Sequence, residues 1–225
     1  MARTRAPAAP PAPRPALTRD RIAAAALALV DEAGLEGCTM RRLGQVLGVE
    51  AMALYHHFPG KGPLLDAVMD RLVEEIRFDP PEAARPLERL RTTVRSYRGI
   101  ALRHPRAFLL MAARRFNTPR TFAVYERLLA NFAELGLDAK GQAHWFRLVG
   151  GFASAAGMAY AASVEQVPDA TPLALQHAPQ AIPFPHVRAV APYLRVEALE
   201  EAFEFGLDVL FEALASATRP KRARR

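Results

Sequence analysis

Two short helical patterns separated by one glycine lie between residues 39 and 61. Thr39 is suited to cap the first helix through its hydroxyl, and Gly48 is suited to end it, because glycine adopts the left-handed backbone conformation that closes helices. The apolar residues of this helix are expected to share one buried face at spacings of three and four: Leu43, Val46 and Leu47. Two helices joined by so tight a turn predict a helix-turn-helix unit.

The second helix of this unit has an unusual outward face. We expect it to begin near Glu50 and to bury Leu54 and Phe58. The side chains expected to point outward are small, aromatic or imidazole groups, namely Met52, Ala53, Tyr55 and His56. Such a face suits a helix in a DNA major groove, where side chains touch base edges and thymine methyl groups. The alternative for Tyr55 is a half-buried ring with its hydroxyl in water.

Charged and imidazole side chains flank these outward positions. Arg41 and Arg42 lie in the first turn of the first helix, where positive charge opposes the helix macrodipole. This placement favours a phosphate partner, with ordinary surface charge as the alternative. His56 and His57 are adjacent and diverge by about 100° on a helix, so they cannot both ligate one metal ion. We therefore predict no metal site.

The stretch from residue 17 to residue 76 resembles the DNA-binding domain of the TetR family of transcriptional regulators. GVEAMALYHHFPGK is similar to the recognition-helix signature of that family. The resemblance implies that Tyr55, His57 and Lys61 contact phosphates. It also implies that the following residues lie near base edges: Arg41, Met52 and His56. Ala53 departs from the pattern, because many members carry Ser or Thr there, and Thr39 then supplies the hydroxyl. The full set of predicted DNA contacts is Thr39, Arg41, Arg42, Met52, Ala53, Tyr55, His56, His57 and Lys61.

Composition indicates a cytoplasmic protein without a membrane span. The 225 residues contain no uninterrupted apolar run of the length that a spanning helix needs. Residues 1–16 contain five prolines and no apolar core of a signal peptide, and we expect a disordered basic arm. The single cysteine, Cys38, fits a reducing compartment.

Positive charge is concentrated at the two ends of the chain. Of the 30 Lys and Arg residues, three lie in residues 1–16 and five in residues 218–225, so the rest nearly balances the 23 acidic residues. These basic ends would attract phosphates, and the arm would reach the minor groove; the alternative is that both ends only aid solubility.

The remainder of the chain has helical periodicity throughout, which predicts an all-α fold. We expect a DNA-binding domain over residues 17–78 and a larger regulatory and dimerisation domain over 79–217, divided by the Asp-Pro-Pro break at 79–81. The expected further helices span Arg19 to Glu32, Pro63 to Ile76, Pro86 to Arg103, Pro105 to Arg115, Pro119 to Leu135, Ala139 to Ala162 and Val196 to Ala215. The Pro-rich stretch over 167–192 is either functional or mobile.

Two of these helices are candidates for self-association. The helix over 139–162 carries Gly150, Gly151 and Ala155, small residues that let another helix approach closely. The helix over 196–215 has an apolar stripe that includes Phe203, Leu207 and Leu210, and its acidic stripe is most simply a solvated face. AFEFGLDVLFEAL is similar to the closing helix of the tetracycline-repressor-like C-terminal domain, which implies an intermolecular four-helix bundle. The alternative places both helices in the internal core.

Aromatic and polar residues on the central helices predict a small-molecule pocket. The candidates are His104, Met111, Arg114, Phe116, Tyr125, Trp145 and Phe152, and the same cluster includes Phe146, Met158 and Tyr160. We expect Arg114 or His104 to be the polar group, and residues 183–186 to cover the mouth. The helix that follows the His-Pro pair has no histidine after its start, so metal-chelated tetracycline is not the expected ligand.

These observations predict a homodimeric transcriptional repressor that binds a palindromic double-stranded DNA operator and is released by an unknown small-molecule effector. No cofactor is expected. The sequence contains no phosphate loop, Gly-rich dinucleotide turn, nucleophile elbow or zinc spacing, which argues against an enzyme. The alternatives are a DNA-binding regulator controlled by a partner protein and, less favoured, a helical enzyme with an attached DNA reader.

Overall fold

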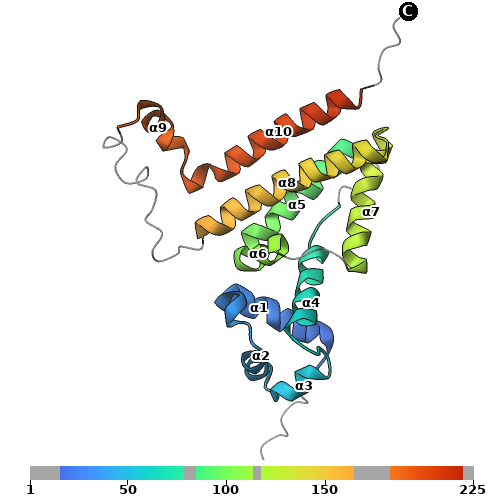
Figure 1. Ribbon diagram of the computed structural model, residues 1–225, viewed down its shortest axis with the longest axis vertical. Helices are drawn as coiled ribbons and strands as arrows, with labels where there is room; N and C mark the ends of the chain where they lie inside the picture. Colours follow the sequence, from blue (N-terminus) through green and yellow to red (C-terminus); the bar gives the residue numbers. More distant parts are fainter. Residues whose placement is uncertain (1–15, 79–84, 114–117, 165–182, 220–225) are drawn as a thin grey trace, which may run out of the picture.

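The computed structural model describes residues 16–78, 85–113, 118–164 and 183–219, and within these ranges every regular element is a helix. Helices α1 to α4 form a small lower domain, and the remaining helices form a larger body above it (Figure 1). The all-α prediction is confirmed. No helix in the described ranges is long and apolar enough to cross a membrane.

The lower domain consists of α1 (Arg19–Gly37), α2 (Met40–Leu47), α3 (Ala51–Tyr55) and α4 (Lys61–Glu74). The predicted caps are present: the hydroxyls of Thr18 and Thr39 each accept a hydrogen bond at 3.2 Å from the backbone N–H three residues later. Gly48 ends α2 in the left-handed conformation, with φ 68° and ψ 35°. The turn predicted from the glycine is therefore confirmed.

The buried face of α2 differs from the predicted one. Leu43 is fully buried, but Val46 is 59% exposed. Gly44 takes the buried position instead, and a Cβ there would lie 2.8 Å from the carbonyl oxygen of Val49. Because α2 and α3 approach closely at this glycine, the packed face of α2 is rotated toward Gly44 and Val46 is turned outward.

The lower domain and the body share one hydrophobic core. Leu54 and Phe58 are fully buried, as predicted, and hold α3 against α1 and α4. The same cluster continues into the body through Ile100, Phe108 and Met111. A movement of the lower domain therefore has to be accommodated by the body helices that it contacts.

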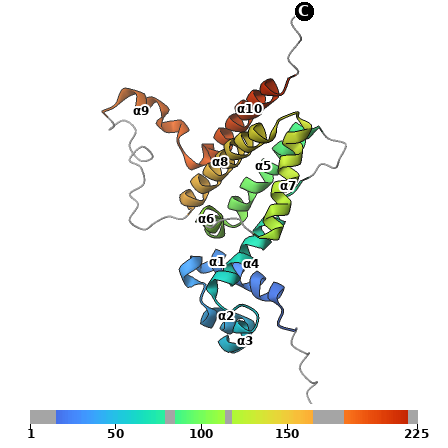
Figure 2. The same ribbon diagram turned by 45° about the vertical axis from the view of Figure 1, so that its right-hand side comes forward.

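The body consists of six α-helices in the described ranges, with two short 3-10 helices. They are α5 (Pro86–Arg103), α6 (Pro105–Ala113), α7 (Pro119–Glu134), α8 (Ala139–Val164), α9 (Pro185–Val190) and α10 (Leu199–Ala217), with η3 (Ala191–Tyr193) and η4 (Val196–Ala198) before α10. Most lie close to their predicted ranges. Helix α9 falls in the Pro-rich stretch and has no predicted counterpart, and it projects away from the body on the side opposite to α7 (Figures 1 and 2).

Helix α10 is fixed to α5 by a row of ion pairs. Asp208 pairs with Arg91 at 2.5 Å, Glu204 pairs with Arg95 at 2.6 Å, and Glu200 pairs with the buried Arg98. Glu200 and Asp208 nevertheless remain 61% exposed, so the interpretation of the acidic stripe as a solvated face is compatible with these ion pairs. The stripe faces α5, because arginines on α5 recur at a matching spacing.

Candidate functional site

The outward face of α2 and α3 has the predicted composition. Arg41 and His56 are exposed, Met52 is 69% exposed, and Tyr55 is 43% exposed. Ala53 is half-buried beside them. These side chains form a surface of mixed aromatic, imidazole and cationic groups on a helix that is held from behind by Leu54.

Four of the predicted DNA contacts also make contacts within the chain. Lys61 donates from Nζ to the carbonyl of Leu35 at 2.6 Å, and this bond ties the start of α4 to the end of α1. The other three are Arg42, which pairs with Glu32 at 3.0 Å, the capping residue Thr39, and His57, whose carbonyl accepts from Arg19. An ammonium group has three N–H donors, so the bond to Leu35 leaves Lys61 with two others.

His104 lies at the junction between the lower domain and the body. It is the C-cap of α5, and its ring nitrogens contact Asp31 at 2.6 Å and Glu75 at 3.0 Å. Burial raises the pKa of the Asp31 carboxyl, although its hydrogen bond to His104 opposes that shift. The prediction of His104 as a ligand contact is wrong, because the helix end directs the imidazole toward α1 and α4.

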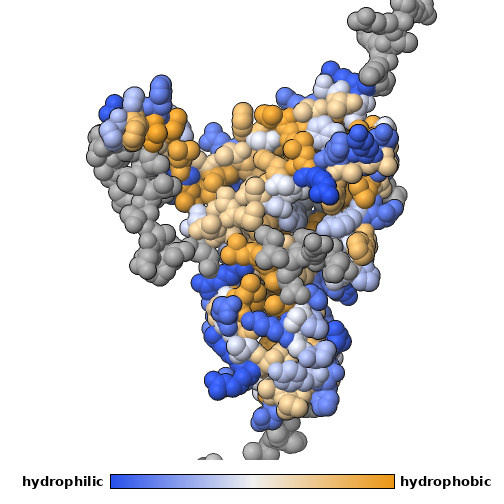
Figure 3. All heavy atoms as spheres, viewed as in Figure 1, coloured by the Kyte–Doolittle hydropathy of each residue, from blue (hydrophilic) through white to orange (hydrophobic). Residues whose placement is uncertain are grey.

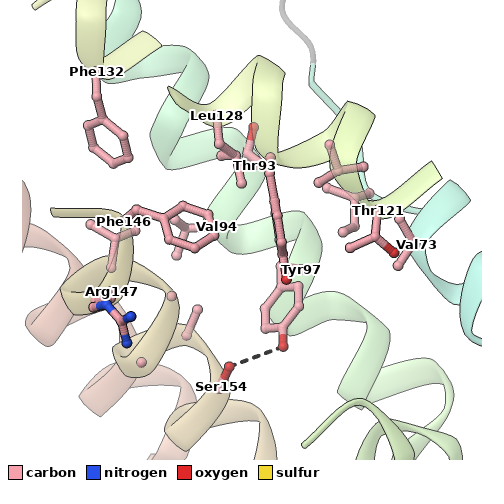
Figure 4. Close-up of a pocket in the computed structure, with 17 residues that line it drawn as sticks. Val73, Thr93, Val94, Tyr97, Thr121, Leu128, Phe132, Phe146, Arg147 and Ser154 are labelled. Atoms are coloured by element: carbon pink, nitrogen blue, oxygen red, sulfur yellow. Dashed lines mark hydrogen bonds between the residues drawn. The ribbon is translucent and has the colours of Figure 1, made fainter. Parts of the chain in front are cut away.

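A cavity of about 230 Å³ lies in the body between α4, α5, α7 and α8 (Figure 4). Its walls are mostly aliphatic and aromatic, and they include Val73, Ile76, Val94, Val124, Leu128, Phe132, Phe146 and Val149. The polar residues that line it are Thr93, Tyr97, Thr121, Tyr125, Arg147 and Ser154. An apolar cavity with a few polar groups is the usual form of a small-molecule site.

Two hydroxyl groups in the cavity wall contact each other. The hydroxyls of Tyr97 and Ser154 lie 3.1 Å apart in a hydrogen bond (Figure 4). Burial raises the pKa of the Tyr97 phenol, with the Ser154 bond opposing the shift, and burial also raises the pKa of Tyr125. Both phenols are therefore neutral near pH 7 and able to donate hydrogen bonds.

One residue of the cavity wall, Thr121, is connected to α4 through hydrogen bonds. The hydroxyl of Thr121 lies 2.9 Å from that of Thr118, which donates to the carboxylate of Asp70 on α4 at 2.5 Å. Val73 and Ile76, near the carboxyl end of α4, form part of the cavity wall. One helix thus runs from the α2–α3 unit to the cavity.

Among the predicted pocket residues that lie in the described ranges, Tyr125 and Phe146 line the cavity. Met111 is buried in the core that the lower domain shares with the body. Trp145 packs against the cluster around α10, and the Phe152 ring stacks on Phe203 with centroids 5.5 Å apart. Arg114 and Phe116 lie outside the described residues.

The segment expected to act as a lid does not line the cavity. Residues 183–186 are exposed and contribute nothing to the described cavity wall. The residues that the sequence analysis missed include Tyr97, Arg147 and Ser154. Part of this wall could have been predicted from helical spacing, because three of its residues share one face of a helix: Arg147, Gly150 and Ser154.

The predicted interface residues divide into two groups. Gly150, Gly151 and Ala155 are exposed on α8, and Leu210 is half-buried. Phe203 and Leu207 are 3% and 0% exposed within one chain, so their assignment to an interface is wrong. The acidic stripe of α10 turns them inward, onto α5 and α8.

Other apolar side chains of these helices remain outside. Phe205 is 72% exposed, and Val209 and Leu148 are each 52% exposed. Apolar residues gather along α8 and α10 on the face seen in Figure 3. A contiguous apolar surface of this kind is typical of a contact with another chain.

Comparison with known proteins gives matches over both parts of the chain. Residues 22–68 match the family model of bacterial regulatory proteins of the tetR family, and residues 81–217 match that of the tetracycline-repressor-like C-terminal domain. The class G tetracycline repressor protein of Vibrio anguillarum is 30% identical over 208 residues, which are 89% of this chain and 96% of the relative.

Further relatives match over different lengths. The transcriptional repressor DrrR1 of Streptomyces coeruleorubidus is 50% identical over 60 residues, which are 27% of this chain and 22% of that protein. The crystal structure of ActR of Streptomyces coelicolor in complex with actinorhodin superposes with a TM-score of 0.77 at 26% identity. That match covers 91% of this chain and 100% of ActR.

Proposed function

Because the chain belongs to the TetR family of bacterial regulators, we propose that it represses transcription by binding operator DNA and is released by a small molecule. The observation that carries this proposal is the position of α4. Its first residue, Lys61, adjoins the α2–α3 unit, and its Val73, with Ile76 just beyond its end, contributes to the wall of the cavity. A compound that enters the cavity touches the helix that adjoins the α2–α3 unit, which we call the DNA reader.

The DNA contacts belong to the exposed face of α2 and α3. Met52 and His56 project from α3 toward base edges, and Tyr55 reaches a phosphate. Arg41 adds a cation at the start of α2. Lys61 has a second role, because its bond to Leu35 also fixes the relative positions of α1 and α4.

Two copies of the chain bind the two halves of a palindromic operator. Phe205 and Val209 of α10, with Leu148 and Ala155 of α8, form the contact between the copies, since these residues are exposed in one chain. Dimers of helix-turn-helix proteins place their recognition helices about one DNA turn apart, roughly 34 Å. A change in that separation weakens both half-site contacts together.

Effector binding changes the separation of the two recognition helices through α4. The carboxyl half of this helix is held by Thr118 on Asp70 and by Arg103 and His104 on Glu75. A ligand that displaces Val73 or Ile76 has to shift α4 against these contacts, and the shift is transmitted to α3. The ligand therefore favours the conformation in which the two readers no longer match the operator.

The effector is a small organic molecule, as actinorhodin is in the ActR complex. The apolar cavity favours this function over control by a partner protein, because concave apolar sites with a few polar groups are typical of small-molecule binding.

The test is a fluorescence anisotropy titration with genomic fragments that the protein selects from a sheared library. Wild type is expected to retain fragments that contain an inverted repeat, with an affinity that falls steeply with salt. Tyr55→Ala should weaken binding, whereas Tyr193→Ala should not, because Tyr193 is an exposed tyrosine on η3, outside the reader. Equal affinities for the two variants would contradict the assignment of the reader surface.

A further inference from the structure

The cavity face of α8 carries two polar side chains with glycines between them. Arg147, Gly150, Gly151 and Ser154 all line the cavity, at spacings that place them along one side of the helix. Arg147 and Ser154 are seven residues apart, which is about 10 Å along the helix axis at 1.5 Å per residue. The glycines therefore form a flat strip between a cation and a hydroxyl.

The space over these glycines is empty within the described chain. A Cβ added at Gly150 or Gly151 meets no atom within 4 Å. By contrast, a Cβ at Gly157, also on α8, would lie 2.4 Å from the Phe108 ring, so that glycine is explained by internal packing. Both glycines are exposed, so the surface above them is open to a ligand.

Gly150 belongs to the cavity more than to the outer face. Its neighbours four residues away, Phe146 and Ser154, both line the cavity. Gly151 also lines the cavity, but two of its neighbours, Leu148 three residues before it and Ala155 four residues after it, are exposed and absent from the cavity lining. An occupant of the cavity therefore lies over the backbone at Gly150.

The volume and walls limit the size and shape of that occupant. A cavity of about 150 Å³ holds one benzene ring, so a cavity of about 230 Å³ suits a compound of about two rings. Tyr125 and Phe146 meet edge to face with centroids 4.9 Å apart, and Phe132 adds a third aromatic ring to the wall. Such walls and a glycine floor favour a flat aromatic body.

The two ends of the cavity differ in charge. The Tyr97 and Ser154 hydroxyls are neutral and already bonded to each other, so together they can bind a hydroxyl or carbonyl oxygen but cannot neutralise a charge. Arg147 is exposed at the cavity edge, and no acidic side chain in the described ranges pairs with it. A guanidinium with free N–H groups binds a carboxylate through two parallel hydrogen bonds.

We propose that the effector is a flat aromatic compound of about two rings, with a carboxylate at one end for Arg147 and a hydroxyl or carbonyl oxygen at the other for Tyr97 and Ser154. The class rests on the proposed function, because it describes the ligand of the same cavity. It predicts that the aromatic body crosses Gly150 and that neither end group is dispensable.

The test uses isothermal titration of the full-length protein with three naphthalenes. 6-Hydroxy-2-naphthoate carries both end groups, 2-naphthoate lacks the hydroxyl, and 2-naphthol lacks the carboxylate. Wild type should bind 6-hydroxy-2-naphthoate most tightly. Arg147→Gln should weaken that binding about 10- to 100-fold, the range for a hydrogen bond to a charged group, and should leave 2-naphthol unchanged. Arg188→Gln, which removes an exposed arginine of α9, should change neither compound.

Two further variants test the geometry. Gly150→Leu should abolish binding of all three compounds while the helical circular dichroism and the sedimentation coefficient stay those of wild type, because the added side chain enters empty space. Tyr97→Phe should remove the preference for 6-hydroxy-2-naphthoate over 2-naphthoate. A Gly150→Leu variant that binds as wild type does overturns the proposed ligand position.

The outcomes separate the ligand class from the function. If wild type binds 2-naphthol as tightly as 6-hydroxy-2-naphthoate, or binds none of the three, the class is wrong even where operator binding and release by another compound persist. If wild type retains no genomic fragment, the proposed function itself fails, whatever the naphthalenes do.

Discussion

The same substitution at two glycines of α8 should have opposite effects on stability. Gly157 is buried, and an added Cβ would lie 2.4 and 2.5 Å from two atoms of the Phe108 ring and 3.3 Å from Ala101. Phe108 is fully buried and meets Tyr97 edge to face at 5.4 Å, so a shift of its ring would disturb that contact. At Gly150, the added Cβ meets nothing within 4 Å.

The magnitudes follow from two opposing effects. Replacing a mid-helix glycine by alanine stabilises the helix by about 0.5–1 kcal/mol. An extra methyl group in a packed core costs about 1–3 kcal/mol. Gly157→Ala should therefore lower the free energy of unfolding by up to about 2.5 kcal/mol, because the cost of displacing the buried Phe108 ring exceeds the helix gain. Gly150→Ala should raise it by about 0.5–1 kcal/mol, since only the helix effect operates there.

Thermal and urea unfolding followed by circular dichroism measures both changes. For a chain of this size, about 1 kcal/mol corresponds to a Tm change of about 2–4 °C. Both variants must be compared at one protein concentration, with sedimentation confirming an unchanged oligomeric state, because dimerisation shifts Tm. Adding Phe108→Leu should remove the penalty of Gly157→Ala in a double-mutant cycle. Equal Tm changes for the two alanine variants would refute the packing argument.

Two further predictions concern α10. Phe205→Glu should convert the dimer to a folded monomer in sedimentation velocity, whereas Phe203→Glu should unfold the chain, because only Phe203 is buried within it; a dimeric Phe205→Glu variant would contradict the proposed interface. The hydrogen bond from Arg95 lowers the pKa of Glu204 below its ordinary value of 4.5, so this contact stabilises the fold above pH 4.5 and is lost as the pH falls through the lowered value. Urea unfolding of Glu204→Gln should therefore show a smaller loss of stability on acidification than wild type, and an identical pH profile would show that the contact contributes nothing.

The DNA reader was predictable because its signals are local. Thr39 caps α2 and Gly48 ends it, and both roles depend on residues within a few positions of each other. The burial of Leu54 and Phe58 follows from helical spacing in the same short segment. Val46 was assigned wrongly because the close approach at Gly44 is a tertiary contact with the next helix.

The cavity was less predictable, because its wall depends on how four helices are rotated against one another. Trp145 and Phe146 are neighbours in the sequence, and one position on a helix is a rotation of about 100°. Both rings pack against the same core cluster, but Phe146 lines the cavity and Trp145 does not. The aromatic residues of the sequence indicated that α8 contributes to the pocket, but they did not indicate which side of α8 faces it.

The ion pairs between α5 and α10 determine which surfaces remain for a partner and for a ligand. Since the acidic stripe of α10 is held by α5, its apolar residues divide into a buried set around Leu207 and an outer pair, Phe205 and Val209. Helix α8 borders both surfaces: its Gly150 lines the cavity, and its Leu148 is exposed on the outer face. Because a rigid helix cannot move one side without the other, a ligand at the proposed position over Gly150 would act directly on the proposed dimer contact. This second connection, beside the one through α4, relates effector binding to the spacing of the two DNA readers.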